Sequence, residues 1–222
     1  MKAYIALPEK PNGAGIVLSS SLWGINSDLR ETTDYFAKLG YAVIAPNLFW
    51  RLKENHGIDY DFKCLNDVMA LMKASNDPNG MTDLRAALVE LRRNVTFERA
   101  GIIGWCYGGR IACLFATEDI FDSVVGIYPT FLETRLDISQ KITCALSIHL
   151  AGIEQYSSME NAGERIEEAF AGKDKVELFA YPGVRHGFDF APPHPDFNHS
   201  AARLCDSRVA LFLKRTLARP EG

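Results

Sequence analysis

A cysteine stands at the centre of residues 104–109, Gly-Trp-Cys-Tyr-Gly-Gly. The apolar run before this segment predicts a strand over residues 100–104, and the run after it predicts a helix over 108–116. Small residues on both sides of the central position are what a nucleophile elbow requires, because larger side chains would collide in so sharp a turn. The central residue of an elbow is strained and exposed. A thiol at a helix N-terminus is activated by the helix dipole, so Cys106 can replace the usual serine. The alternative is an ordinary tight turn with a buried thiol.

A nucleophile of this kind needs a base and an acid on later loops. His186 follows an apolar run and a Pro-Gly turn, a position that fits a general base. Glu154 is the only carboxylate between the strand predicted at 144–150 and Glu160, and it would hold the imidazole in the correct tautomer. An exposed loop glutamate is the alternative interpretation, and Asp189 would be the next acid to test.

The other histidines have structural or solvated interpretations. His149, at the end of a predicted strand, is expected to be buried, and the remaining three are expected to be solvated: His56, His194 and His199. Cys113, Cys144 and Cys205 have apolar neighbours and are expected to be buried structural thiols.

Strands and helices alternate along the chain, which favours an α/β fold: one mostly parallel sheet with helices on both faces. Strands 2–7 and 15–19 are expected to form a hairpin across the turn at 11–13, and residues 75–80 are expected to break a helix. Further strands are predicted at 41–45, 100–104, 123–128, 144–150 and 176–181, with helices from 28 to 39 and at 60–73, 81–92, 108–116, 161–170 and 201–217.

Length and composition favour one globular domain spanning residues 1–222. With 47% hydrophobic and 23% charged residues, the chain is not disordered, and a net charge of −4 without long charge runs favours neither nucleic acid nor a membrane as partner. Five cysteines without a C-x-x-C pair suggest neither disulfides nor a metal site. No signal peptide or membrane span is recognisable, so we expect a cytoplasmic protein with a small-molecule substrate and no cofactor.

The pattern resembles the dienelactone hydrolase family of the α/β-hydrolase fold. The resemblance extends over nearly the whole chain and is carried by these segments: 15–18, 23–26, 30–31, 40–48, the elbow at 104–109, and 186–188. It implies hydrolysis of a carboxylic ester or lactone through an acyl-thioester on Cys106, with Glu154 and His186 completing a catalytic triad. It also implies an oxyanion hole formed by the backbone N–H groups of Leu22 and Tyr107.

The chain departs from that family at three places. Glu154 replaces an aspartate, Ser21 replaces a glutamate that holds the resting thiol in the family, and no arginine follows His186 to grip a substrate carboxylate. Arg51 is the remaining cation expected near the site. About half of the aromatic residues near the strand ends are expected to line the pocket and the rest to enter the core: Trp23, Phe49, Trp50, Trp105, Tyr107, Phe188 and Phe190. This set predicts a preference for neutral substrates.

A second class of function remains open. The changes at Ser21 and Glu154 are also compatible with a non-catalytic small-molecule-binding protein that retains the hydrolase fold, because function depends on the site rather than on the fold. A thiol redox protein is disfavoured, since no resolving cysteine lies near Cys106 in the sequence.

Overall fold

Seven strands form a single sheet in the computed structural model, which describes residues 1–192 and 194–218. Their order across the sheet is β1-β3-β2-β4-β5-β6-β7, and every neighbouring pair is parallel except β1 and β3. The strands are β1 (Ala3–Ala6), β2 (Ala14–Ser19), β3 (Ala42–Pro46), β4 (Arg99–Trp105), β5 (Ser123–Ile127), β6 (Ala145–Ile153) and β7 (Val176–Arg185). The mostly parallel α/β sheet expected from the sequence is therefore confirmed.

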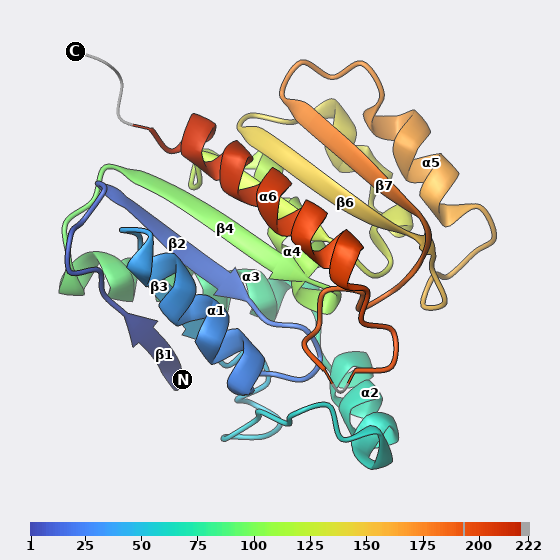
Figure 1. Ribbon diagram of the computed structural model, residues 1–222, viewed down its shortest axis with the longest axis horizontal. Helices are drawn as coiled ribbons and strands as arrows, with labels where there is room; N and C mark the ends of the chain where they lie inside the picture. Colours follow the sequence, from blue (N-terminus) through green and yellow to red (C-terminus); the bar gives the residue numbers. More distant parts are fainter. Residues whose placement is uncertain (193, 219–222) are drawn as a thin grey trace.

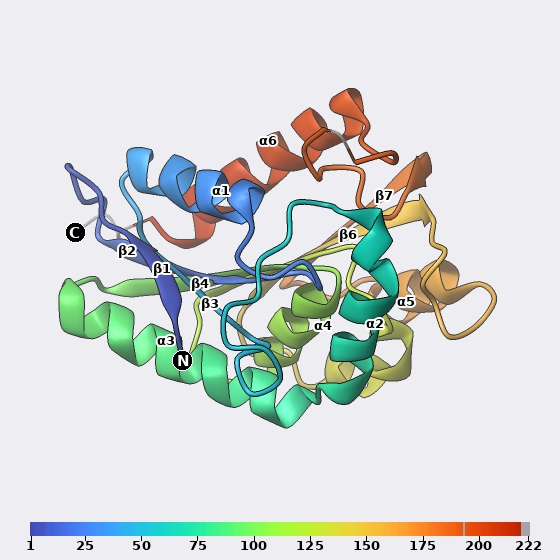
Figure 2. The same cartoon turned by 90° about the horizontal axis from the view of Figure 1, so that it is seen from below.

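Helices cover both faces of the sheet, as Figures 1 and 2 show. Helices α1 and α6 lie on one face, and α3, α4 and α5 lie on the other. The helices are α1 (Ser27–Lys38), α2 (Leu65–Ala74), α3 (Asp77–Asn94), α4 (Tyr107–Leu114), α5 (Ala162–Phe170) and α6 (His199–Thr216). This double cover explains the continuous apolar runs in β2, β3 and β5, each of which is buried along its whole length.

The hairpin predicted for the first two strands is wrong. β1 pairs with β3 in antiparallel orientation, whereas β2 lies between β3 and β4 and is parallel to both. Because both edges of β2 are already paired, β1 can only extend the sheet beyond β3.

The helix break predicted at residues 75–80 is present but shorter, since α2 ends at Ala74 and only residues 75–76 separate it from α3. α3 begins at Asp77, because the side chain of Asn76 caps the helix by accepting a hydrogen bond from the backbone N–H of Asn79 at 2.9 Å. Pro78 lies in the first turn, where its missing N–H costs no hydrogen bond. The helix predicted at 60–73 begins later, since residues 62–64 form a 3₁₀ turn before α2. The predicted loop at 129–141 contains two 3₁₀ helices, Leu132–Thr134 and Leu136–Gln140.

The last two strands are longer than predicted, and this matters for the site. β6 and β7 continue to Ile153 and Arg185, and these two residues are register partners. Glu154 and His186 are therefore the next residues after two paired strand ends. The sheet itself places them side by side.

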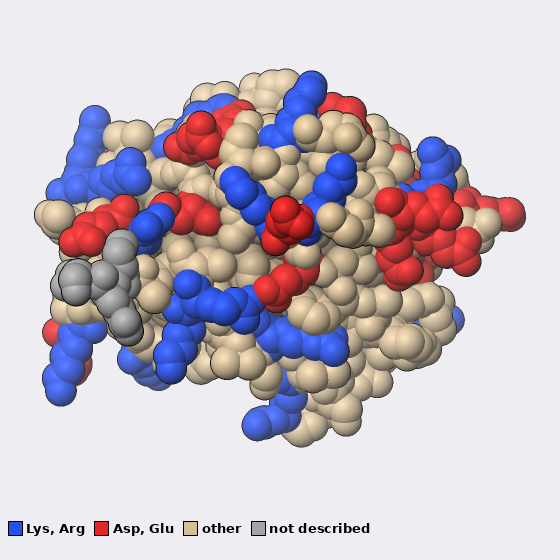
Figure 3. Space-filling view, turned by 90° about the horizontal axis from the view of Figure 1, so that it is seen from above, with Lys and Arg blue, Asp and Glu red and all other residues tan. Residues whose placement is uncertain are grey.

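Charged side chains of both signs are spread over the face seen in Figure 3, with acidic groups gathered toward the end that carries α5. In the described part of the chain, no helix combines the length and apolarity that a membrane span requires.

Candidate active site

Cys106 occupies the turn between β4 and α4 in a strained backbone conformation. Its φ of 56° and ψ of −120° lie in a region that side chains rarely adopt. A Cβ atom on Gly104 would overlap the carbonyl oxygen of Gly108, and one on Gly108 would overlap the carbonyl oxygens at the end of β2. Both glycines are therefore required by close backbone packing, as the elbow pattern predicts.

Glu154 and His186 form a direct contact beside the elbow. Nδ1 of His186 lies 2.8 Å from Oε2 of Glu154, and Oε1 of Glu154 accepts the backbone N–H of Tyr156 at 2.8 Å. The carboxylate is thus held at both oxygens, and Nδ1 of the imidazole carries the donated proton. The imidazole ring also packs against the rings of Tyr128 and Tyr156, at centroid distances of 4.5 and 4.9 Å.

The electrostatics of Cys106 favour its thiolate. Burial raises the pKa of the thiol, but the positive charge of His186 and the hydrogen bonds to the sulfur outweigh burial, so the pKa of Cys106 is lowered overall. The hydroxyl of Thr130 donates to the sulfur at 3.1 Å, and the backbone N–H of Tyr107 also stabilises the thiolate.

His186 shows the reciprocal shift. Burial lowers the pKa of the imidazole, whereas Cys106 and Glu154 raise it, to about 10 overall. Nε2 of His186 is buried and has no protein hydrogen-bond partner of regular geometry in residues 1–192 and 194–218, so its attraction to Cys106 is mainly one of charge. The two groups together favour a thiolate–imidazolium pair.

Cys106 is only 2% exposed, so the expectation of an exposed nucleophile is wrong. A small, partly open cavity of about 20 Å³ lies over it, which is room for about one water molecule. Side chains from three separate loops, from the 3₁₀ turn at 62–64 and from the start of α2 line this space. Its lining residues are Leu22, Trp23, Phe62, Leu65, Cys106, Tyr156, His186, Phe190 and His194.

Two histidines expected in solvent are buried. His194 is 9% exposed and lines the cavity, with its ring edge-on to Tyr60, Phe62 and Phe190. His56 is 2% exposed and lies under the loop after β2. The expectation failed because loops distant in sequence fold over both rings. His149 is buried and His199 is exposed, as predicted.

The predicted substrate-binding residues are divided by the structure. Trp23 lines the cavity over Cys106. Trp50 and Arg51 do not, because both side chains bind the carboxylate of Asp83, Arg51 through two hydrogen bonds. Asp83, on α3, therefore holds both side chains outside the lining of this cavity.

Trp105 and Phe188 also lie outside the cavity over Cys106. The indole N–H of Trp105 donates to Asp189 at 2.9 Å, and Tyr128 donates to the other oxygen of the same carboxylate. Phe188 is fully buried against Tyr128 and Tyr181. Asp189 is therefore bound to two aromatic donors and not to the imidazole of His186.

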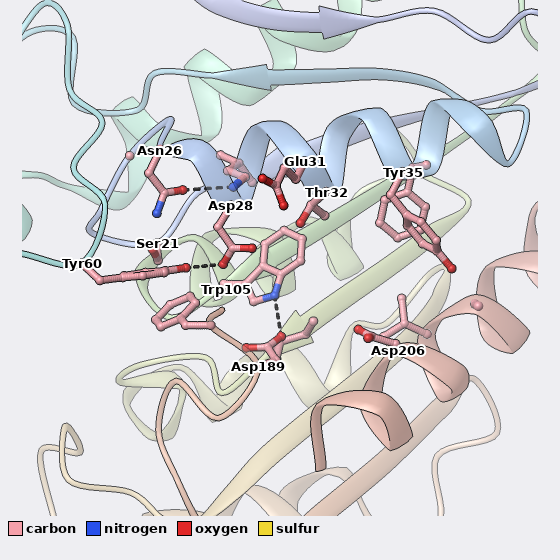
Figure 4. Close-up of a pocket in the computed structure, with 17 residues that line it drawn as sticks. Ser21, Asn26, Asp28, Glu31, Thr32, Tyr35, Tyr60, Trp105, Asp189 and Asp206 are labelled. Carbon is pink, nitrogen blue, oxygen red and sulfur yellow. Dashed lines mark hydrogen bonds between the residues drawn. The ribbon is translucent and has the colours of Figure 1, made fainter. Parts of the chain in front are cut away.

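A larger cavity of about 360 Å³ lies between α1 and α6. Figure 4 shows the Trp105–Asp189 hydrogen bond on its wall, with the carboxylates of Asp28, Glu31 and Asp206 around the same space. Burial raises the pKa of Asp189 to about 7, against the lowering effect of its two hydrogen bonds.

The two predicted oxyanion-hole residues both adjoin Cys106. Leu22 lines the cavity, and Tyr107 is the first residue of α4, so its N–H has no intrahelical acceptor. The hydroxyl of Ser21 accepts the N–H of Trp23 at 3.3 Å and makes no hydrogen bond to the sulfur of Cys106 in the described residues. The hydrogen bond to the sulfur comes instead from Thr130, which sequence reasoning missed because no motif marks it.

No group of three or more His, Cys, Asp or Glu side chains in the described residues could hold a metal ion. The chemistry available at the elbow is that of a buried, activated thiol, an oriented imidazole and backbone donors, which suits acyl transfer.

The sheet order, the helices on both faces and the elbow after β4 define an α/β-hydrolase fold. The sequence model described as "Dienelactone hydrolase family" matches residues 1–217, so the chain belongs to that family.

Individual relatives agree with this assignment. The chain is similar to carboxymethylenebutenolidase 1 of Cupriavidus pinatubonensis, with 27% identity over 95% of this chain and 90% of the relative. It is also similar to the carboxymethylenebutenolidase of Pseudomonas putida, with 26% identity over 95% and 89%. The crystal structure of a candidate dienelactone hydrolase from Klebsiella pneumoniae superimposes with a TM-score of 0.78 and 22% identity over 96% of this chain and 92% of that chain, which shows the shared fold.

Proposed function

We propose that this protein hydrolyses carboxylic esters or lactones through a thioester formed on Cys106. The observation that carries the proposal is the alignment of three groups: a thiol of lowered pKa at a strained elbow, an imidazole beside it, and a glutamate 2.8 Å from the far nitrogen of that imidazole. Membership of a family of lactone-cleaving relatives supports the same reaction.

The reaction has two halves. The thiolate of Cys106 attacks the substrate carbonyl carbon, and the N–H groups of Leu22 and Tyr107 donate to the oxyanion that forms. The C–O bond then breaks, and the leaving alkoxide takes the proton from Nε2 of His186. Water next gives a proton to the same nitrogen and attacks the thioester carbonyl; the C–S bond then breaks, which releases the acid and restores the thiolate–imidazolium pair. Glu154 keeps Nδ1 protonated and stabilises the imidazolium throughout. With a lactone, alcohol and acid belong to one product.

The lining of the cavity favours neutral substrates. Among the residues that the structure describes, no lysine or arginine lines the space over Cys106, and Arg51 is bound to Asp83. Each missing charge-assisted hydrogen bond to a substrate carboxylate forgoes on the order of 1.5–3 kcal/mol. The relatives named for carboxymethylenebutenolide hydrolysis therefore support the reaction type rather than that substrate.

The test compares a neutral aryl ester with a matched ester that bears a carboxylate on its acyl group. We expect the neutral ester to have a kcat/KM about ten- to a hundredfold higher, and Cys106→Ala to abolish turnover of both. Binding of esters without any turnover would show the alternative, a non-catalytic binding protein. A preference for the carboxylate that weakens with salt would show that a cation reaches the site and would overturn the proposed substrate class.

A further inference from the structure

A short segment before η1 (Phe62–Cys64) shapes the loop that follows β2. The N–H of Ile25 donates to the carbonyl of His56 at 3.0 Å, and the N–H of Ile58 donates to the carbonyl of Trp23 at 3.0 Å. Between these two hydrogen bonds, Gly24 and Gly57 form an isolated antiparallel bridge. The loop at 22–25 is therefore folded against the backbone of residues 56–58.

The side chain of His56 adds a third connection to the same loop. Its Nε2 lies 2.7 Å from the carbonyl oxygen of Leu22, and because a carbonyl only accepts, Nε2 must carry the proton and donate. Nδ1 is buried without a partner in the described residues. Burial and the nearby Lys53 both lower the pKa of His56, against the hydrogen bond to Leu22, so the ring is neutral with its single proton on Nε2.

The ring of His56 is also held from behind. It packs edge-on against Phe49 at 5.1 Å, and Phe49 packs against the ring of Tyr107 at 5.6 Å. Tyr107 begins α4 directly after Cys106. Phe49 therefore lies between the ring of His56 and the start of α4. Through it, the loop that carries His56 packs against the helix that follows the nucleophile.

These contacts fix the peptide that follows Leu22 at both of its ends. His56 donates to the carbonyl oxygen of this peptide, which belongs to Leu22. The hydroxyl of Ser21 accepts a hydrogen bond from the N–H of the same peptide, which belongs to Trp23. The N–H of Leu22 itself has no protein acceptor in residues 1–192 and 194–218, and Leu22 lines the cavity over Cys106. The arrangement orients Leu22 while leaving its N–H available.

We propose that His56 is a positioning residue for the oxyanion hole: by donating to the carbonyl of Leu22 it aims the Leu22 N–H at the oxyanion of the substrate. The inference rests on the proposed function, because an oxyanion forms only if Cys106 attacks a carbonyl group. His56 does not touch substrate and acts only through Leu22.

The test uses two amides in place of the imidazole. His56→Gln can place its amide N–H near the position of Nε2 and reach Leu22, whereas the shorter His56→Asn cannot. Both are made with Cys64→Ser, which removes the partly exposed thiol. Two rates at Cys106 are measured for each: acylation by p-nitrophenyl acetate, which passes through an oxyanion, and alkylation by iodoacetamide, which displaces iodide at a saturated carbon and forms no oxyanion.

Removal of an oxyanion-hole donor lowers rates by about 10²–10³, so its misalignment in His56→Asn should slow acylation about 10- to 100-fold. Alkylation of His56→Asn should change less than about threefold because it forms no oxyanion, and His56→Gln should retain acylation within about threefold because its amide keeps the Leu22 N–H aligned. His199→Asn, at an exposed position, is the matched control and should change neither rate. If His56→Asn does not fold, His56→Leu serves as the second variant without a donor, and the retention expected of His56→Gln remains a test by itself.

The outcomes separate this inference from the proposed function. Equal losses of acylation and alkylation in His56→Asn, or no loss of either, would overturn the role of His56, as would failure of a folded His56→Gln to retain acylation. Absence of acylation at Cys106 in the parent protein would instead overturn the proposed function.

Discussion

Nδ1 of His186 and Oε2 of Glu154 lie 2.8 Å apart at the ends of β7 and β6, two strands whose last residues are register partners. The sheet therefore fixes the backbone positions of both groups. Because the second oxygen of Glu154 accepts the N–H of Tyr156, the carboxylate cannot rotate freely away from the imidazole.

Replacing Glu154 by glutamine should lower kcat by roughly 10²- to 10⁴-fold, because the amide no longer stabilises the imidazolium or fixes its tautomer. The unfolding temperature should change little, since Glu154 is partly exposed. Glu160→Gln, at an exposed position on the same loop, is the control. Steady-state kinetics with a neutral aryl ester checks this, and near-normal turnover of Glu154→Gln would mean that Glu154 is not the acid.

Alkylation by iodoacetamide should select Cys106 and should reach half of its maximal rate below pH 9.0, the ordinary pKa of the thiol, because the pKa of Cys106 is lowered. Burial raises the pKa of Cys113 to about 12 and that of Cys144 to about 11, so these thiols should stay unlabelled. Peptide mapping of protein labelled across a pH series gives both the labelled cysteine and the midpoint of the pH dependence. A midpoint at or above 9.0, or faster labelling of a core cysteine, would contradict the ion pair.

Thr130→Val removes the hydroxyl that donates to the sulfur of Cys106 while preserving side-chain volume. Loss of a hydrogen bond to a charged group costs about 1.5 kcal/mol or more, so the pKa of Cys106 should rise by about one unit. Alkylation should slow about tenfold at pH values well below the pKa of Cys106 and be unchanged at a pH where the thiol is fully ionised. The same midpoint in the pH dependence of alkylation for both proteins would show that the hydroxyl does not stabilise the thiolate.

Asp189 makes the stability of the fold depend on pH. Burial raises its pKa from 3.8 to about 7, so the folded state binds its proton more tightly than the unfolded state does. This contribution is complete below about pH 4 and is lost as the pH rises through about 7. The amide introduced by Asp189→Asn cannot ionise, and the advantage in unfolding temperature of the parent over this variant should therefore shrink between about pH 4 and 7. Scanning calorimetry at several pH values measures this difference, which would be constant if Asp189 titrated normally.

The elbow and the alternation of strands and helices along the chain could be predicted from the sequence, because glycine spacing and apolar runs are local signals. The contacts that decide the pocket could not. Arg51 meets Asp83 from 32 residues away, and Trp105 meets Asp189 from 84 residues away, so neither pairing leaves a periodic or spacing signal. The side chains that cover Cys106 also come from segments far apart in the sequence, so no local pattern predicts that they meet.

The hydrogen bonds of the first turn of α3 explain another difference. Asn76 and Pro78 have the composition of a breaker, but they act as a cap and a first-turn proline. Asparagine and proline occur both in turns that end a helix and at helix N-termini. The packing of the apolar face of α3 against the sheet decides which of the two forms here.

The central claim is that Cys106 carries the acyl group during turnover. The most direct measurement is quenched-flow mass spectrometry of the protein mixed with a neutral p-nitrophenyl ester, followed by peptide mapping. We predict that the mass of one acyl group appears on the peptide containing Cys106 and then decays at a rate no slower than kcat, and that Cys106→Ala shows neither the adduct nor turnover. Turnover retained by folded Cys106→Ala, or an acyl group found on another residue at a rate that accounts for kcat, would contradict the claim.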